Sequence, residues 1–288
     1  MKHQIDGDFG LPECGDTIRH ALREDVGWAD ITSLFTVPED AAATAVITAK
    51  EPGVVAGLGV AAAVFEAVDS DIAFLASLEE GAVFESGAAL CTVAGRARSL
   101  LSGERVALNF LQRLSGIATL TRAFVDRIGG SDARIVDTRK TAPGLRALEK
   151  YAVRVGGGFN HRMGLFDAVL IKENHISAAG GIAAAVAAAY QRASHVVTVT
   201  VECRTLDQVR QAVEADVDIV LLDNMSPDTM REAVETYPDV SMEASGGVSL
   251  DNVADIAATG VRIISVGALT HSSRALDLSM ILSLQHAG

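Results

Sequence analysis

The sequence predicts an α/β protein whose larger part is a βα barrel. Three observations lead to this prediction. In the second half of the chain, short apolar runs end in a polar or small residue, helical patches separate them, and the last four recur about every twenty residues. The runs are almost entirely apolar, as expected of strands covered on both faces. No G-x-G-x-x-G motif opens the first βα turn, which favours a closed barrel over an open sheet.

The first part of the chain, up to about Leu101, has a different texture that predicts a small α+β domain. Its strand-like runs cover residues 45–49, 54–57 and 90–93, and its helical patches cover residues 16–24 and 60–68. A long amphipathic helix follows over residues 103–128, where apolar residues recur at helical spacing. Ser102 is its expected N-cap.

The second part supplies the strands of the predicted barrel. They cover residues 135–137, 169–172, 197–202, 219–223, 240–243 and 263–267. Helical patches cover residues 206–215, 227–236 and 250–259. The Ala-rich residues 180–189 are too few to span a membrane and are expected to form a helix of a globular domain, because Ala has the highest helix propensity.

Composition limits the function. The 288 residues are 49% hydrophobic and 21% charged, with a formal net charge of −13, so non-specific binding to nucleic acid or to an anionic membrane is not expected. Three cysteines without a C-x-x-C pair give no zinc or disulfide framework and suit a reducing cytoplasm. Residues 1–11 are polar and lack the apolar core of a signal peptide, so a cytoplasmic protein is predicted.

Cations gather in one segment of this acidic chain. Between Arg134 and Lys172 there are eight Lys or Arg residues and only three Asp or Glu residues. A local excess of positive charge acts through its local field, whatever the net charge of the chain. This segment is therefore expected to hold an anion.

The active site of a βα barrel lies at the carboxyl ends of its strands. The chemically capable residues at those ends are Arg139, Lys140, Lys172, Glu202, Asp223, Glu243, Ser245 and Gly267. The early strands thus end in cations and the later strands in carboxylates.

The cations admit more than one role. Arg139 and Lys140 suit a carboxylate or a phosphate, but they could equally be surface cations of a solvated loop. Lys172 could anchor an anion, form a Schiff base, or pair with Glu202 or Asp223.

Two further groups of residues could take part. Glu202 and Asp223 can hold Mg²⁺ through water while substrate phosphates complete the coordination, or they can belong to a buried polar network. The glycine-containing segments 244–247 and 265–268 follow the last two strands and are typical of phosphate-binding loops.

His161 and Arg162 follow a run of three glycines and lie near the cationic strand ends in sequence. A single His is more often structural than catalytic, although its cationic neighbours favour anion binding here. Arg105 lies near the start of the long helix, so it either faces water or meets an anion.

These segments resemble the quinolinate phosphoribosyltransferase family, also called nicotinate-nucleotide pyrophosphorylase (carboxylating). The blocks that carry the resemblance are D-T-R-K-T-A-P-G-L-R (137–146), E-K-Y-A-V-R (149–154), G-G-G-F-N-H-R (156–162), L-I-K-E-N-H (170–175), L-D-N (222–224), E-A-S-G-G-V (243–248) and S-V-G-A-L-T-H-S (265–272). Upstream, residues 21–27 and 104–119 also fit.

The resemblance implies an N-terminal α/β sandwich domain over residues 1–112 and an incomplete βα (TIM-like) barrel over residues 113–272. Residues 273–288 would return to the N-terminal domain. It also implies a homodimer with shared active sites, or a higher oligomer of such dimers. The implied reaction joins quinolinate to phosphoribosyl pyrophosphate with Mg²⁺ and gives nicotinate mononucleotide, pyrophosphate and CO₂.

The matching positions imply roles for individual residues. The quinolinate carboxylates would meet Arg139, His161, Arg162 and Lys172, with Arg105 reaching in from the partner subunit. Lys140, Glu202 and Asp223 would act on phosphoribosyl pyrophosphate and its metal, and Thr138 would also bind substrate. The 5′-phosphate would be held by two loops, made of Ser245, Gly246 and Gly247 and of Val266, Gly267 and Ala268.

Three other interpretations use the same residues. One is a relative of the molybdenum-transport-associated ModD proteins that acts on a different base; those relatives depart from the N-H-R and I-K-x-N-H blocks that this chain retains. Another is a Schiff-base aldolase built on Lys172, against which the density of other cations argues. The third is a non-catalytic binding protein, which the presence of Arg105, Glu202 and Asp223 disfavours.

Overall fold

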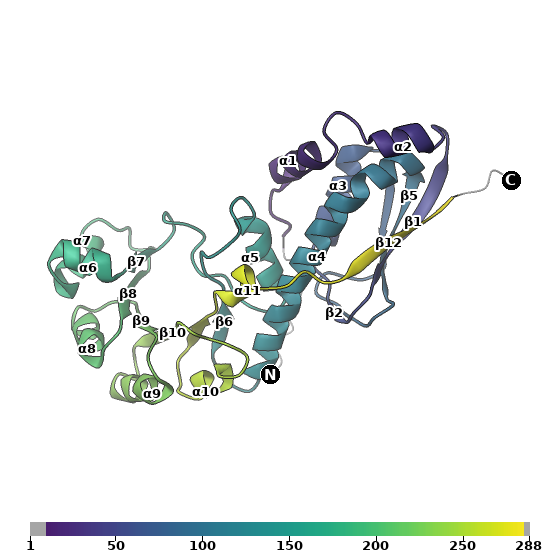
Figure 1. Cartoon of the computed structure of the whole chain (residues 1–288). Coiled ribbons are helices and arrows are strands. Elements are labelled where there is room, and N and C mark those ends of the chain that lie inside the picture. The colour runs from purple at the N-terminus through teal and green to yellow at the C-terminus, as the bar shows by residue number, and fades with distance from the viewer. Residues whose placement is uncertain (1–9, 285–288) are drawn as a thin grey trace. The chain divides into compact units, whose positions relative to one another are not determined.

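The computed structural model describes residues 10–284 and contains two compact units (Figure 1). The described part of the first unit comprises residues 10–122, 142–157 and 272–284. The second unit comprises residues 123–141 and 158–271. Among the described residues, no helix combines the length and apolar character needed to cross a membrane.

The first unit is built on an antiparallel sheet with the strand order β12-β1-β5-β3. Its strands are β1 (Ala42–Ala49), β3 (Ala73–Ala76), β5 (Ala89–Arg96) and β12 (Leu278–Leu284), and β2 (Gly53–Val54) pairs with β4 (Val83–Phe84). Buried and more exposed residues alternate along β1, as expected of a strand with one face on a core. The C-terminal strand β12 pairs with β1 from Ala43 opposite Leu284 to Ala49 opposite Leu278.

Helices of the first unit pack by their apolar faces. They are α1 (Gly15–Asp25), α2 (Ile31–Thr36), α3 (Leu58–Val68), α5 (Arg146–Val155) and most of α4 (Ala97–Arg127). In α3, the wholly buried Phe65 lies with its ring centre 6.4 Å from that of Phe74 in β3. This contact joins the helix to the sheet through apolar burial.

The start of α4 differs from the prediction. The helix begins directly after β5, so Ser102 lies inside it and is not its N-cap. The Ser102 hydroxyl donates to Oδ2 of Asp30 at 3.2 Å, and Asp30 itself caps α2 by accepting the Ser33 N–H. Ser102 therefore supports the residue that caps α2 and does not cap α4.

The observed units also differ from the predicted boundary at residue 112, which falls inside α4. Helix α5, which the sequence analysis did not predict, belongs to the first unit together with most of α4. The physical link is Glu149, wholly buried on α5, which accepts a hydrogen bond from Nε of Arg113 on α4 at 2.8 Å. A buried carboxylate needs such a partner, so α5 stays on α4 although the barrel sequence surrounds it in the chain.

The second unit contains a six-stranded parallel sheet with the order β6-β11-β10-β9-β8-β7. Its strands are β6 (Arg134–Val136), β7 (Val169–Ile171), β8 (Val199–Cys203), β9 (Ile219–Asp223), β10 (Ser241–Ser245) and β11 (Ile263–Ser265). Its helices are α6 (Glu173–Ala179), α7 (Ile182–Tyr190), α8 (Leu206–Glu214), α9 (Pro227–Thr236), α10 (Val253–Ala257) and α11 (Ala268–His271).

The predicted fold class, an α/β protein with a parallel sheet and a separate N-terminal sheet domain, is confirmed. In Figure 1 the strands curve around a centre while α6 to α10 lie along their outer side. The sheet has two edges, β6 and β7, so within the described residues it is not the closed barrel expected from periodicity. It has instead the open form of an incomplete barrel.

Candidate active site

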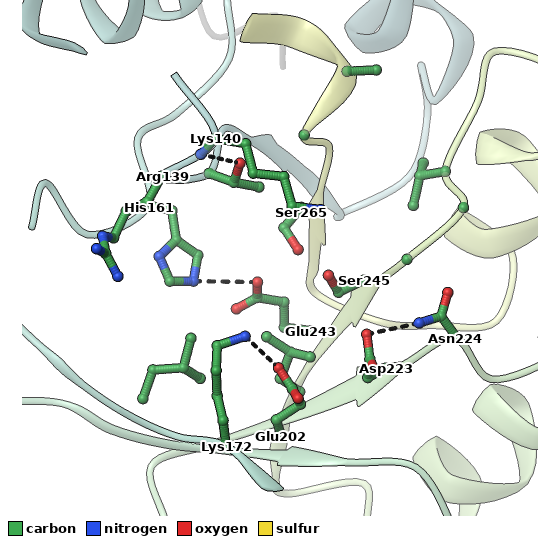
Figure 2. A pocket seen from close by; sticks show the side chains of 18 of the residues that line it. Arg139, Lys140, His161, Lys172, Glu202, Asp223, Asn224, Glu243, Ser245 and Ser265 are labelled. Atoms are coloured by element: carbon green, nitrogen blue, oxygen red, sulfur yellow. Dashed lines mark hydrogen bonds and ion pairs between the residues drawn. The ribbon is translucent and has the colours of Figure 1, made fainter. Parts of the chain in front are cut away.

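A cavity of about 720 Å³ opens in the second unit where the parallel strands end. It is lined by Thr138, Arg139, Lys140, His161, Arg162, Leu170, Lys172, Glu202, Leu221, Asp223, Asn224, Glu243, Ser245, Gly246, Gly247, Val248, Ser265, Gly267, Ala268 and His271. Figure 2 shows that side chains from several strand ends point into this one space. The predicted site residues line it with two exceptions, Arg105 and Val266.

The two exceptions have different reasons. Arg105 is an exposed residue of α4 in the first unit and does not line the cavity. Val266 is 1% exposed, and its N–H donates to the carbonyl of Val136 at 2.9 Å. Because this N–H is already used between strands, it is not available to a phosphate group.

The loop after β6 is fixed at its backbone. The Lys140 N–H donates to Oγ1 of Thr138 at 3.1 Å, and the Lys140 carbonyl accepts a bond of 2.7 Å from the hydroxyl of Thr270. Thr270 is wholly buried in α11. The backbone of Lys140 is therefore held in place by hydrogen bonds with its own loop and with α11.

Two guanidinium groups lie close enough to affect one another. Burial and the nearby charge of Arg139 lower the pKa of Arg162. Nη1 of Arg162 donates to the carbonyl of Ala168 at 2.9 Å, which holds this side chain in place. Two like charges held side by side at a cavity favour binding of an anion with more than one negative charge.

His161 is held through its backbone and its ring. Asp137, wholly buried after β6, accepts the His161 N–H at 2.9 Å and a bond from Nδ2 of Asn160 at 2.6 Å. In the ring, Nδ1 accepts the backbone N–H of Arg162 at 2.8 Å, and Nε2 lies 3.4 Å from Oε1 of Glu243 (Figure 2). The sequence analysis left the choice between a structural and a functional His161 open; the structure places it in the cavity.

The carboxylates at the later strand ends are paired with cations. Nζ of Lys172 lies 2.6 Å from Oε2 of Glu202, which is the ion pair considered as an alternative from the sequence. Oδ2 of Asp223 lies 3.1 Å from Nε of Arg204, and its Oδ1 accepts a bond of 3.0 Å from Nδ2 of Asn224. Such pairs of partly exposed groups are weak and can exchange with a charged ligand.

The glycine loop after β10 allows close approach of the backbone. Gly246 has φ +93° and Gly247 has φ +60°, a region that other residues rarely adopt. A Cβ atom on Gly246 would lie 2.2 Å from Oδ1 of Asn224, so this position also has no room for a side chain. Backbone N–H groups at such a turn form a concave site suited to a phosphate.

Family models match both parts of the chain. The model described as "Quinolinate phosphoribosyl transferase, N-terminal domain" matches residues 30–115, and the corresponding C-terminal domain model matches residues 117–281. The chain belongs to the quinolinate phosphoribosyl transferase family. The resemblance inferred from the sequence blocks is thereby confirmed.

Curated members of this family are similar over nearly their whole length. Nicotinate-nucleotide pyrophosphorylase [carboxylating] from Mycobacterium leprae is 46% identical over 274 residues, covering 93% of this chain and 96% of the relative. The probable enzyme of the same name from Bacillus subtilis is 43% identical over 270 residues, covering 93% of each. Among solved structures, NadC from Streptococcus pyogenes has a TM-score of 0.91 at 41% identity, covering 95% of this chain and 97% of that one.

Several cavity residues of this family member were not assigned a role from the sequence. They are Leu170, Leu221, Asn224, Glu243, Val248, Ser265 and His271. Glu243 was noted only as a strand-end residue, and Asn224 and His271 stood in the recognised blocks. Asn224 adopts φ +56° directly after β9. This backbone conformation depends on the turn that the folded chain makes there, and residue type alone does not predict it.

The carboxylates of the cavity fit a metal held mainly by substrate. Among the described residues there is no group of three or more His, Cys, Asp or Glu side chains that could hold a metal ion by itself. Glu202 and Asp223 lie at the ends of the neighbouring strands β8 and β9, and each can offer oxygen through water. Mg²⁺ keeps several waters and binds with substrate phosphates, so two carboxylates suit it.

Proposed function

We propose that this chain transfers the phosphoribosyl group of phosphoribosyl pyrophosphate to quinolinate with loss of CO₂, the last step to nicotinate mononucleotide in NAD biosynthesis. The observation that carries the proposal is a single cavity lined by a set of cations and by a set of glycine loops and carboxylates, in a chain of this family. The first set suits a dicarboxylate, and the second suits a phosphorylated sugar with a metal.

Quinolinate would be held by the cations around His161. Arg139 and Arg162 offer planar guanidinium groups for two carboxylates, and Lys172 adds a compact charge. Two neighbouring carboxylates relieve the mutual repulsion of the two guanidinium groups. A monocarboxylate relieves it less, and this gives the site a basis for preferring quinolinate over nicotinate.

Phosphoribosyl pyrophosphate would lie across the remaining strand ends. The 5′-phosphate suits the backbone of Ser245, Gly246 and Gly247 and the turn at Gly267 and Ala268. Lys140 suits the pyrophosphate, because its backbone is fixed and its side chain extends along the turn at Gly267, where an added Cβ atom would lie 3.2 Å from its Cδ.

The reaction needs no enzyme nucleophile. The pyridine nitrogen forms a bond to C1 of the ribose while the bond from C1 to the pyrophosphate oxygen breaks, and pyrophosphate leaves with the electron pair. Glu202 and Asp223 can stabilise the positive charge that develops on the sugar. The ring nitrogen is then cationic, so the adjacent carbon can keep the electron pair when CO₂ leaves and afterwards take a proton from solvent.

Mg²⁺ is proposed as the cofactor, with Glu202 and Asp223 as its protein-side partners through water. When bound, it would neutralise charge on the leaving pyrophosphate. Lys172 would then lose Glu202 as a partner and become available to the acid substrate.

A homodimer with shared sites is proposed because Arg105 is exposed on a different unit from the cavity. Two large aromatic side chains of the first unit are also exposed: Trp28 is 84% and Phe35 is 75% exposed. The hydrogen bond from Ser102 to Asp30 holds these segments beside α4. Exposed aromatic side chains are typical of a protein interface.

A reducing compartment such as the cytoplasm is proposed for this protein. All three cysteines are buried and unpaired, and burial raises the pKa of Cys91 and of Cys203 to about 12. Thiols in this state are poor nucleophiles and gain nothing from an oxidising environment.

The test is an assay of the purified chain with quinolinate, phosphoribosyl pyrophosphate and Mg²⁺ that follows CO₂ and nicotinate mononucleotide. Nicotinate replaces quinolinate in a parallel reaction, and Mg²⁺ is removed with chelator in another. The expected result is turnover with quinolinate that depends on Mg²⁺ and is absent with nicotinate. Lack of product from either acid would contradict the proposal and favour a different base.

A further inference from the structure

Glu243 is an unusual group in the cavity. It is 2% exposed in β10, and its Oε1 makes no hydrogen bond to any residue that the structure describes. Figure 2 shows it between His161 and the pair formed by Lys172 and Glu202. A buried carboxylate oxygen without a hydrogen bond is costly, so this oxygen is expected to have a use in the site.

The role of Glu243 follows from the cationic or hydrogen-bond donor group nearest to its Oε1. Within residues 10–284, the ion-pair partner of Glu243 is His161, whose Nε2 lies 3.4 Å from Oε1. Lys172 is paired with Glu202, and Nη1 of Arg162 donates to a backbone carbonyl. Glu243 therefore interacts mainly with the imidazole ring of His161.

The hydrogen bonds of the ring fix where its proton lies. Nδ1 of His161 accepts the Arg162 N–H at 2.8 Å, so Nδ1 carries no proton in this arrangement. The proton of the neutral ring is then on Nε2, which faces Glu243. The backbone of His161 is held by buried Asp137, so the ring is constrained from both ends.

We propose that Glu243 is a positioning residue that acts together with the Arg162 N–H on Nδ1: it keeps the proton of His161 on Nε2 and fixes the plane of the ring beside the carboxylate-binding cations. The distance of 3.4 Å is longer than a good hydrogen bond, so the N–H can be shared with a substrate carboxylate that enters the cavity. His161 then presents a donor and not a bare nitrogen to the acid. The substrate part of this inference rests on the proposed function.

Two variants separate the hydrogen bond from the charge. Glu243→Met removes the acceptor at similar volume, and Glu243→Gln removes the charge but keeps an acceptor for Nε2–H. We expect Glu243→Met to weaken quinolinate binding, measured by calorimetry, about tenfold, with Glu243→Gln recovering most of it. The KM for phosphoribosyl pyrophosphate should change less than about twofold in both. An equal loss for both substrates would overturn the proposal.

The same substitution in a His161→Ala background tests whether Glu243 acts through the ring. Because the ring is absent, Glu243→Met should cause no further loss of quinolinate binding. Losses that simply add would show that Glu243 acts by another route and would overturn the proposal.

Nitrogen NMR of the ¹⁵N-histidine-labelled, substrate-free protein gives a readout independent of activity. The Nε2–H form of His161 should dominate in the unsubstituted protein and in Glu243→Gln, and both forms should be present in Glu243→Met. A dominant Nδ1–H form in the unsubstituted protein would refute the inference even if no variant folds. Failure of turnover with both acids would count against the proposed function alone, since this spectrum needs no substrate.

Discussion

Two like charges beside one another, Arg139 and Arg162, are the residue-level feature that most directly indicates the ligand. Two arginines on an open surface would move apart, because each positive charge destabilises the charged form of the other. Burial and Arg139 together lower the pKa of Arg162. A site that keeps them together is arranged for an anion that compensates both.

In the first unit, the carboxylate of Asp69 shows the opposite case, in which a neighbouring charge stabilises the ionised form. Asp69 accepts hydrogen bonds from Nε of Arg96 at 2.9 Å and from the Ser99 hydroxyl at 2.7 Å, and these hold its pKa at about 2. The ordinary value is 3.8, so the ionised form is favoured by folding. This contribution to the free energy of unfolding is fully present above about pH 5 and is lost as the pH falls through the folded pKa.

The corresponding prediction concerns Asp69→Asn. The substitution should lower the urea midpoint of unfolding at pH 7, and the difference from the unsubstituted protein should shrink progressively toward pH 2. Asp207→Asn, on the exposed face of α8 with Arg210 as partner, is the matched control and should change the midpoint much less. A difference for Asp69→Asn that stays constant with pH would contradict the assigned cause.

Residue type and strand-end position were sufficient to find the main charged residues of the cavity. Arg139, Lys140, Lys172, Glu202 and Asp223 were identified in this way, because the barrel places strand ends together whatever the details of packing. The sequence did not indicate the pairing of Asp223 with Arg204. That pairing depends on side-chain positions between neighbouring strands, which spacing along the chain does not determine.

At the scale of elements, the loop between β10 and α10 requires glycine at position 246 for two reasons, its backbone conformation and the lack of space for a side chain. Gly246 has a positive φ and lies against the side chain of Asn224. The Asn224 N–H in turn donates to the Ser245 carbonyl at 2.8 Å, so the two loops are joined. A side chain at position 246 must displace the side chain of Asn224, which directly follows β9.

Gly246→Ala is therefore expected to raise the KM for phosphoribosyl pyrophosphate by about tenfold or more, with a smaller effect on quinolinate. Steady-state kinetics with each substrate varied in turn will measure it. Gly87→Ala is the control, since Gly87 also has positive φ but has open space around its α-carbon and lies in the first unit. Equal effects of Gly246→Ala on both substrates would argue against a phosphate role for this loop.

The accuracy of element prediction followed the strength of local signals. The predicted strand over residues 219–223 and the helix over residues 227–236 coincide with β9 and α9, where an apolar run and a Ser-Pro helix start act together. Helix α5 was not predicted, because its buried Glu149 and Lys150 interrupt the apolar pattern expected of a packed helix. The contacts of Glu149 with Arg113 and with the Ala142 N–H explain why its charge can lie inside.

At the scale of the whole molecule, the cavity and Arg105 lie on different units of the chain. The proposed dimer lets Arg105 of one copy serve the cavity of the other. Its test is complementation between Arg105→Ala and Lys172→Ala, each expected to be nearly inactive alone. After joint unfolding and refolding, mixed dimers contain one site without either substitution, so about a quarter of full activity should return.

Mixing the two folded variants without exchange of subunits is the control and should give no recovery. Activity that fails to return after verified exchange would indicate that Arg105 serves its own chain or has no role. Sedimentation measurements on each variant will show whether the oligomer itself is retained.

The sequence alone determined the α/β class, the order of most barrel elements, the family and the set of strand-end residues. These follow from periodicity, from short blocks of fixed residue type and from the rule that parallel strands share an edge. Only the tertiary structure decided that α5 joins the first unit, that Val266 uses its N–H between strands and that Glu243 faces His161. Each of these depends on which residues far apart in the sequence come into contact when the chain folds. The local sequence pattern carries no information about such contacts.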